Sequence, residues 1–152
     1  MKTVAQEGFK VIGILIRTTN ENGQSAQDIP KLWERFMTED TKAQIPNTVD
    51  SEVLCIYTNY EEDHTKPYDT LLGCRVASLD NIPVGMVGRT FEPSQYAQSM
   101  AKGNLTQGIV YQSWVDIWNQ DLDRTFRADF EVYGEKAQDP THAEVDIFVG
   151  IK

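Results

Sequence analysis

Hydrophobic and polar positions in the first half of the chain predict a strand, a helix and two further strands. Residues 9–19 (FKVIGILIRTT) are rich in β-branched and apolar side chains, which is typical of a strand. Residues 26–39 predict a helix, because their apolar positions have helical spacing: Ile29, Leu32, Trp33, Phe36 and Met37. Residues 52–60 and 68–78 then predict two strands joined by the polar connector EEDHTKP.

The first predicted helix also carries a signal for its start. Ser25 is followed three residues later by Asp28, which favours a capping box in which the two ends of the motif satisfy each other's free backbone N–H groups. Pro30 is compatible with this helix because it lies in the first turns, where a missing N–H costs little.

The second half of the chain repeats this order of elements. Residues 95–103 (QYAQSMAKG) predict a strand, and residues 126–134 and 143–151 predict two more. Between them, residues 109–120 predict a helix with one apolar stripe, formed by Val110, Trp114, Ile117 and Trp118. The repeat is one of element order, since the sequence identity between the halves is slight.

Two short strands, at residues 2–7 and 86–91, are predicted to precede the two units. Aromatic residues occupy matching places in the two units: Trp33 with Trp114, and Tyr57 with Tyr133. Each amphipathic helix needs a sheet face on which to bury its apolar stripe. We therefore expect a single α+β unit with a largely antiparallel sheet and two helices.

Composition narrows the class of protein. The 152 residues suffice for one domain with its own core. With 23 acidic against 14 basic residues and a formal net charge of -9, the chain lacks the basic character of proteins that bind nucleic acid. No run approaches the roughly 18 apolar residues that cross a bilayer, and the N-terminus does not resemble a signal peptide. We expect a cytoplasmic protein without direct contact to nucleic acid or membrane.

The sequence contains no recognisable motif for catalysis or metal binding. The two histidines, His64 and His142, do not form a zinc pattern or a catalytic triad with their neighbours. Cys55 and Cys74 lie in apolar runs, so we expect buried free thiols rather than a disulfide. Accordingly, we predict no catalytic residue, no metal site and no cofactor.

Two features remain that bear on function: the aromatic content and one glutamate. Three Trp, six Tyr and six Phe make up 10% of the chain, and the default interpretation of each is core packing. In the strand FRADFEVY, alternation places Glu131 on the face shared by Arg127, Asp129 and Tyr133, opposite that of Phe126, Ala128, Phe130 and Val132. Alternation alone would leave Glu131 in solvent.

Several motifs resemble a known family. They are YDTLLGCRV at residues 68–76, the segment from Pro83 through VGM to SQYAQSMAKG, and DFEVY at residues 129–133 before the last strand, EVDIFVGI. From about Phe9 to its C-terminus, the chain resembles the effector-binding domain of AraC-type and MerR-type transcription regulators. This domain is also called gyrase-inhibitor-like, and it includes multidrug-binding members.

The resemblance implies a fold and a site. Two pseudo-symmetric β-α-β-β modules, at about residues 1–80 and 81–152, would form one effector-binding domain, with a curved antiparallel sheet or barrel and two main helices packed outside. A ligand pocket would lie between the modules, on the strand face opposite the helices. In multidrug-binding relatives, a glutamate after the second helix meets the positive charge of the ligand, and its match here is Glu131. Candidate ligand-binding residues are therefore Glu131, Tyr133, Tyr57, Trp114, Tyr111, Tyr60 and Phe91. Trp33 and Phe36 stay open between core and pocket.

The function that the resemblance implies is non-enzymatic binding of lipophilic cationic small molecules such as drugs and dyes. We expect a monomer. Because the chain carries no DNA-binding domain, we also expect it to act alone or through a separate DNA-binding regulator. Two alternatives stay open. One is a protein-interaction module that inhibits or escorts a partner such as gyrase, and the other is a small-molecule hydrolase with Glu131 as its general base.

Overall fold

Eight strands and two main helices make up the fold of the computed structural model, which describes residues 1–152. The strands are β1 (Lys2–Gln6), β2 (Phe9–Thr18), β3 (Val53–Thr58), β4 (Tyr68–Val76), β5 (Val87–Phe91), β6 (Ser94–Gly103), β7 (Arg124–Tyr133) and β8 (Ala143–Ile151). The main helices are α1 (Ser25–Thr38) and α3 (Ile109–Trp118), while α2 (Thr41–Gln44) is a single turn. The predicted strands and helices are confirmed, with ends that differ by no more than two residues.

The sequence did not predict α2 or the four short 3-10 helices, which are η1 (Glu21–Gly23), η2 (Leu105–Gln107), η3 (Glu135–Ala137) and η4 (Pro140–His142). No helix of the structure combines the length and the apolar character needed to cross a membrane. Cys55 and Cys74 are buried free thiols, as expected.

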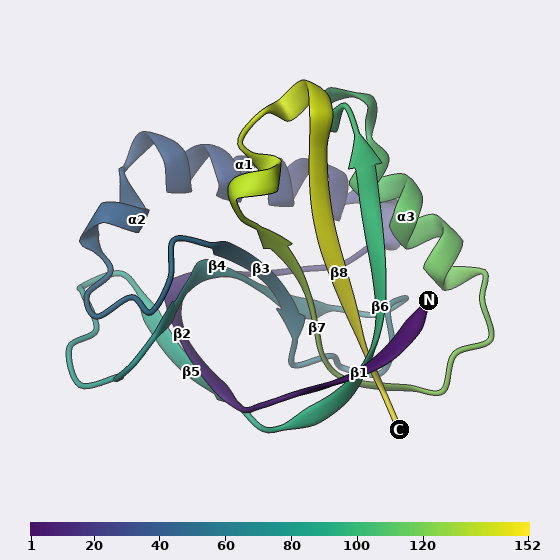
Figure 1. Cartoon of the computed structure of the whole chain (residues 1–152), viewed down its shortest axis with the longest axis horizontal. Coiled ribbons are helices and arrows are strands. Elements are labelled where there is room, and N and C mark those ends of the chain that lie inside the picture. The colour runs from purple at the N-terminus through teal and green to yellow at the C-terminus, as the bar shows by residue number, and fades with distance from the viewer.

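All eight strands form one antiparallel sheet in the order β1-β6-β8-β7-β3-β4-β2-β5 (Figure 1). The two halves of the chain exchange their first short strands, since β1 pairs with β6 and β5 pairs with β2. Strands β3 and β7 pair at the centre and join the halves, with Cys55 opposite Glu131. The predicted α+β class with an antiparallel sheet and two main helices is confirmed.

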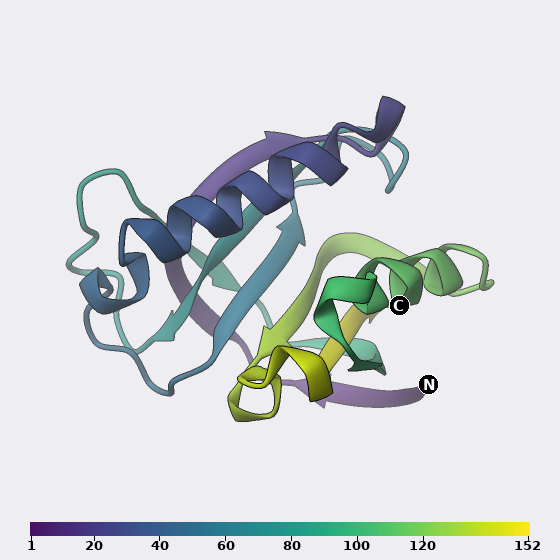
Figure 2. The ribbon, with the colours of Figure 1, turned by 90° about the horizontal axis from the view of Figure 1, so that it is seen from above.

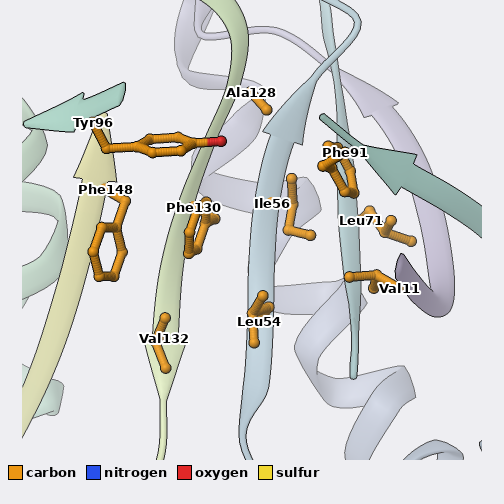
Figure 3. Packing of buried hydrophobic residues seen from close by; sticks show 10 residues of the cluster. All are labelled: Val11, Leu54, Ile56, Leu71, Phe91, Tyr96, Ala128, Phe130, Val132 and Phe148. Atoms are coloured by element: carbon orange, nitrogen blue, oxygen red, sulfur yellow. The ribbon is translucent and has the colours of Figure 1, made fainter. Parts of the chain in front are cut away.

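The face of the sheet away from the helices carries a core made by strands alone (Figure 3). Its buried side chains are Val11, Leu54, Ile56, Leu71, Phe91, Tyr96, Ala128, Phe130, Val132 and Phe148. At its centre, Phe130 stacks on Phe148 with ring centroids 4.8 Å apart, and Tyr96 meets Phe130 edge to face at 5.3 Å. Because successive side chains of a strand point to opposite faces, this core fixes Glu131 on the helix side.

On the helix side, the core is divided into two clusters. Leu32 and Phe36 of α1 pack over β2, β3 and β4, while Trp114 and Ile117 of α3 pack over β6 and β8. Figure 2 shows the two helices over different halves of the sheet. Tyr57 and Tyr133, on the two central strands, are partly buried against both clusters. The space between the helices is thus lined by the middle of the sheet.

The predicted capping box at the start of α1 is wrong. The residue before the helix, Gln24, already has helical backbone angles because η1 runs directly into α1, so no extended cap residue exists. Ser25 instead donates to Asn20 Oδ1 at 2.8 Å. Asp28 Oδ2 accepts from Thr18 Oγ1 at 2.9 Å, which ties the helix to the end of β2.

The predicted alternation along β7 holds for Ala128, Phe130 and Val132 but fails at Phe126. The pairing of β7 with β8 is irregular between Arg124 and Asp129, and Phe126 has a left-handed backbone with φ of 53°. This bulge changes the direction of the side chain. Phe126 therefore lies beside Tyr60 and His64, with ring centroids 5.6 Å and 6.2 Å away, instead of joining the strand-only core.

Candidate functional site

A cavity of about 320 Å³ opens between α1 and α3, over the central strands. Eleven of its 17 lining residues are hydrophobic. The lining residues from helices are Ser25, Ala26, Ile29, Pro30 and Trp33 of α1 and Val110, Tyr111, Trp114 and Trp118 of α3. The others are Asn20, Tyr57, Tyr60, His64, Tyr68, Arg124, Glu131 and Tyr133.

Glu131 lies at the base of this cavity, and only 1% of it is exposed. Its Oε2 atom accepts hydrogen bonds from the Tyr57 hydroxyl at 2.6 Å and from Trp114 Nε1 at 2.7 Å. Its Oε1 atom accepts from the Tyr133 hydroxyl at 2.5 Å. The three donors come from β3, α3 and β7, so the carboxylate ties both halves of the fold together.

These donors are neutral, and no positively charged side chain forms a salt bridge with Glu131. Burial raises the pKa of Glu131, and the hydrogen bonds from Tyr133, Tyr57 and Trp114 partly oppose that rise. Burial also raises the pKa of both tyrosines well above the ordinary value, and the nearby Glu131 charge adds to the rise. Tyr57 and Tyr133 therefore stay protonated and donate at neutral pH.

A second buried carboxylate, Asp129, precedes Glu131 by two residues on β7 and is fully buried. Unlike Glu131, it has a positive partner, since Arg124 Nη2 lies 2.8 Å from its Oδ2. The Tyr60 hydroxyl donates to the same oxygen at 2.5 Å, and the Gly150 backbone N–H donates to Oδ1 at 2.8 Å. The charge of Asp129 is thus compensated within the protein.

Aromatic rings form the walls of the cavity. Tyr57 meets Trp114 and Tyr68 edge to face, with ring centroids 5.5 Å and 5.8 Å away. On the α1 side, Trp33 packs edge to face on Tyr133 at 4.7 Å. On the α3 side, the His64 ring stacks nearly parallel on Trp118 at 5.4 Å. A ligand in the cavity would therefore meet aromatic faces and edges on several sides.

The structure brings together six of the seven residues predicted from the sequence. Glu131, Tyr133, Tyr57, Trp114 and Tyr60 line the interior of the cavity, and Tyr111 lies at its rim with 62% of its surface exposed. The sequence left Trp33 and Phe36 open between core and pocket. Trp33 lines the cavity, whereas Phe36 is buried in the core beneath α1.

Two expectations about the site are wrong. Phe91 does not line this cavity, because it lies on the other face of the sheet, where it stacks on Phe9 with centroids 5.1 Å apart. The cavity itself is on the helix-covered face of the sheet and not on the opposite face. The physical reason is the large strand-only core, whose Phe130 and Val132 fill the opposite face next to Glu131.

The predicted ligand-binding residues did not include Tyr68, Trp118, His64 or Arg124, which also line the cavity. Trp118 belonged to the predicted apolar stripe of its helix, and Tyr68 begins a motif of the resemblance, so both carried a usable signal. His64 lies in the loop between β3 and β4, and Arg124 precedes the bulge of β7. Neither His64 nor Arg124 belongs to a regular repeat of apolar positions, so the sequence pattern does not predict where its side chain lies.

Several known proteins are similar to this chain in sequence or in structure. YobU of Bacillus subtilis (strain 168) is named as a candidate transcriptional regulator. Its sequence is 30% identical to this chain over 144 residues, and the alignment covers 92% of this chain and 90% of YobU. The crystal structure of the integron cassette protein VCH_CASS2 from Vibrio cholerae matches with a TM-score of 0.77 and 28% identity, covering 99% of this chain and 95% of that one. The structure of SAV2435 bound to tetraphenylphosphonium matches with a TM-score of 0.77 and 20% identity, covering 100% and 94% of the two chains.

The model of the Cass2 family, described as integron-associated effector binding protein, matches residues 3–151. The matched segment contains all the residues that line the cavity. The coverage of VCH_CASS2 and of YobU is nearly complete in both directions, so the likeness extends over the whole fold. The chain therefore belongs to the Cass2 family of integron-associated effector-binding proteins.

Proposed function

We propose that this protein binds lipophilic monocations in the cavity between α1 and α3, with Glu131 as the counter-charge. The observation that carries the proposal is a 99% buried carboxylate that accepts three hydrogen bonds from neutral donors and has no positive partner. A buried charge is costly unless it is paired. A cationic ligand would supply the missing charge.

The energetics favour a charged and largely apolar ligand. Two unit charges about 4 Å apart attract by roughly 4 kcal/mol at an effective dielectric constant near 20, before desolvation is subtracted. Trp33, Trp114 and Trp118 add ring surfaces that attract cations and bury apolar area. Such walls select a class of ligand by charge and apolar surface rather than one compound by a fixed pattern of donors. Binding of several drugs and dyes follows.

The comparisons support this proposal. SAV2435, which shares the fold, was solved with tetraphenylphosphonium, a lipophilic cation. The Cass2 family is described as effector-binding proteins, and YobU is named as a candidate regulator of transcription. We further propose that this chain acts as a monomer and that its effect on transcription passes through a separate DNA-binding protein. Light scattering and a pulldown with and without tetraphenylphosphonium test these two points.

The test of the proposed function compares two probes of nearly equal shape and opposite charge, tetraphenylphosphonium and tetraphenylborate. Tryptophan fluorescence follows binding, since Trp114 donates to Glu131 and lines the cavity. We expect the wild type to bind the phosphonium and not the borate. Glu131→Gln should weaken phosphonium binding at least tenfold, because a hydrogen bond or contact to a charged group is worth about 1.5–3 kcal/mol.

Glu34→Gln serves as the matched control, since it removes the same charge from the exposed face of α1 outside the cavity. It should leave phosphonium affinity as in the wild type. If the wild type binds phosphonium and borate equally well, or if Glu131→Gln binds the phosphonium as tightly as the wild type, the carboxylate does not select the ligand and the proposal is wrong.

A further inference from the structure

The cavity has a second polar end, where buried nitrogen atoms lack partners. The Arg124 side chain is 6% exposed, and only its Nη2 atom is used, in the ion pair with Asp129. Its Nε and Nη1 atoms are buried and make no hydrogen bond. The Nδ1 atom of His64 is likewise buried without a partner. Both residues line the same cavity as Glu131.

Buried polar groups in folded proteins nearly always have hydrogen-bond partners, so three unpaired nitrogens at one end of a cavity require an explanation. Phe126 is the neighbour that covers Arg124, with its ring centroid 4.3 Å from the guanidinium carbon. Its ring attracts the charge but offers no oxygen or nitrogen lone pair to the N–H groups. Arg124 and His64 both line the cavity, so a polar group of a ligand seated at this end would be the nearest partner for these nitrogens.

We propose that the Arg124–His64 end of the cavity is a second subsite, which binds a neutral hydrogen-bond acceptor of the ligand, such as a carbonyl or ether oxygen. This inference rests on the proposed function, in which the cationic end of the same ligand lies at Glu131. The acceptor is neutral because Asp129 already compensates the charge of Arg124 at 2.8 Å. An anionic group there would be repelled by the Asp129 carboxylate.

The geometry of β7 sets the spacing of the two ends. Asp129 and Glu131 are two residues apart on the same side of the strand, which corresponds to about 7 Å. Arg124 Nη2 lies 2.8 Å from Asp129, so the second subsite lies close to Asp129. The ligand class is thus an aromatic cation with an acceptor oxygen roughly 7 Å from its charge.

Two probes that differ at one group test this subsite: (4-benzoylbenzyl)trimethylammonium, a ketone, and (4-benzylbenzyl)trimethylammonium, in which a methylene replaces the carbonyl. Wild-type protein should bind the ketone about tenfold more tightly than the methylene compound. In the infrared spectrum, the carbonyl stretch of the bound ketone should move to lower wavenumber, because a hydrogen bond weakens the C=O bond.

Arg124→Lys keeps the positive charge beside Asp129 but removes the planar fork that carries Nε and Nη1. It should bring the ketone-to-methylene affinity ratio close to one and abolish the infrared shift. Arg127→Lys is the matched control, because Arg127 is exposed on the same strand and does not line the cavity. It should keep the wild-type ratio. His64→Phe, which retains the ring stacked on Trp118, should lower the ratio in part.

The wild-type comparison decides the inference even where a variant fails to fold. Equal affinities of the two probes without an infrared shift would overturn the second subsite while leaving the proposed function intact. Tighter binding of (4-carboxybenzyl)trimethylammonium, which carries a carboxylate at the position of the ketone carbonyl, than of the ketone would overturn the preference for a neutral acceptor. Loss of binding for all three probes, together with tetraphenylphosphonium, would instead contradict the proposed function itself.

Discussion

Asp129 and Glu131 lie two residues apart on the helix side of β7, and both carboxylates are buried, yet only Asp129 is paired with a cation. Arg124 compensates Asp129 from within the protein, whereas Glu131 is held by two tyrosines and a tryptophan. In the proposed site, the first carboxylate is a structural charge, and the second is the charge that a cationic ligand would meet. This difference is the electrostatic basis of the proposed site.

The stability of the protein should depend on the first carboxylate much more than on the second. Arg124→Met leaves Asp129 buried without its cation, and we expect a loss of about 3–5 kcal/mol in the free energy of unfolding. Glu131→Gln removes a charge that has no ionic partner, so the change should be about 1 kcal/mol or less. Urea-induced unfolding at neutral pH measures both. Equal losses for the two variants would contradict the division into a structural and an available carboxylate.

The sequence predicted the elements of this fold because each helix and strand buries one face, and burial imposes a period on the chain. The spacing of apolar residues in the sequence therefore shows which face of an element is buried. Examples are Leu32 and Phe36 in α1, and Phe130 and Val132 in β7. Glu131 was found through the motif DFEVY rather than through its period, since alternation alone would have left it in solvent.

Other parts of the site depend on tertiary structure that no period records. The face that holds the cavity was taken from the resemblance, and alternation could not correct it, because inward-facing and outward-facing strand residues alternate identically. Phe91 was included among the pocket residues and lies on the strand-only face, away from the cavity. Arg124 and Phe126 obtain their positions from the bulge in β7, and His64 obtains its position from stacking on Trp118.

Cation binding should depend on pH through Glu131. Burial raises the pKa of this carboxyl above the ordinary value of 4.5, and a protonated carboxyl offers no charge to the ligand. Affinity for tetraphenylphosphonium should therefore be weak at low pH and rise as the pH increases through the pKa of Glu131. Tyr57→Phe and Tyr133→Phe each remove a hydrogen bond that lowers this pKa, so each should move the midpoint upward by about one pH unit or less.

Fluorescence titrations over a series of pH values give this midpoint for each variant. Tyr96→Phe is the matched control, because Tyr96 is a buried tyrosine of the opposite core and does not touch Glu131. Its midpoint should be that of the wild type. A midpoint that moves downward in Tyr57→Phe or Tyr133→Phe would show that the hydroxyls do not stabilise the ionised carboxylate.

Mutation of a core aromatic residue should lower the stability of the protein, whereas mutation of a cavity aromatic residue should change its affinity for the ligand. Phe91 is 8% exposed and stacks on Phe9, so Phe91→Ala should cost about 3–5 kcal/mol of unfolding free energy while the folded protein keeps its affinity for tetraphenylphosphonium. Trp114→Phe keeps an aromatic ring but loses the N–H that Glu131 accepts, so affinity should change severalfold. Urea unfolding and calorimetric titration measure the two quantities on the same samples. The reverse pattern, in which Phe91→Ala abolishes binding by folded protein and Trp114→Phe leaves it intact, would place the ligand on the strand-only face of the sheet.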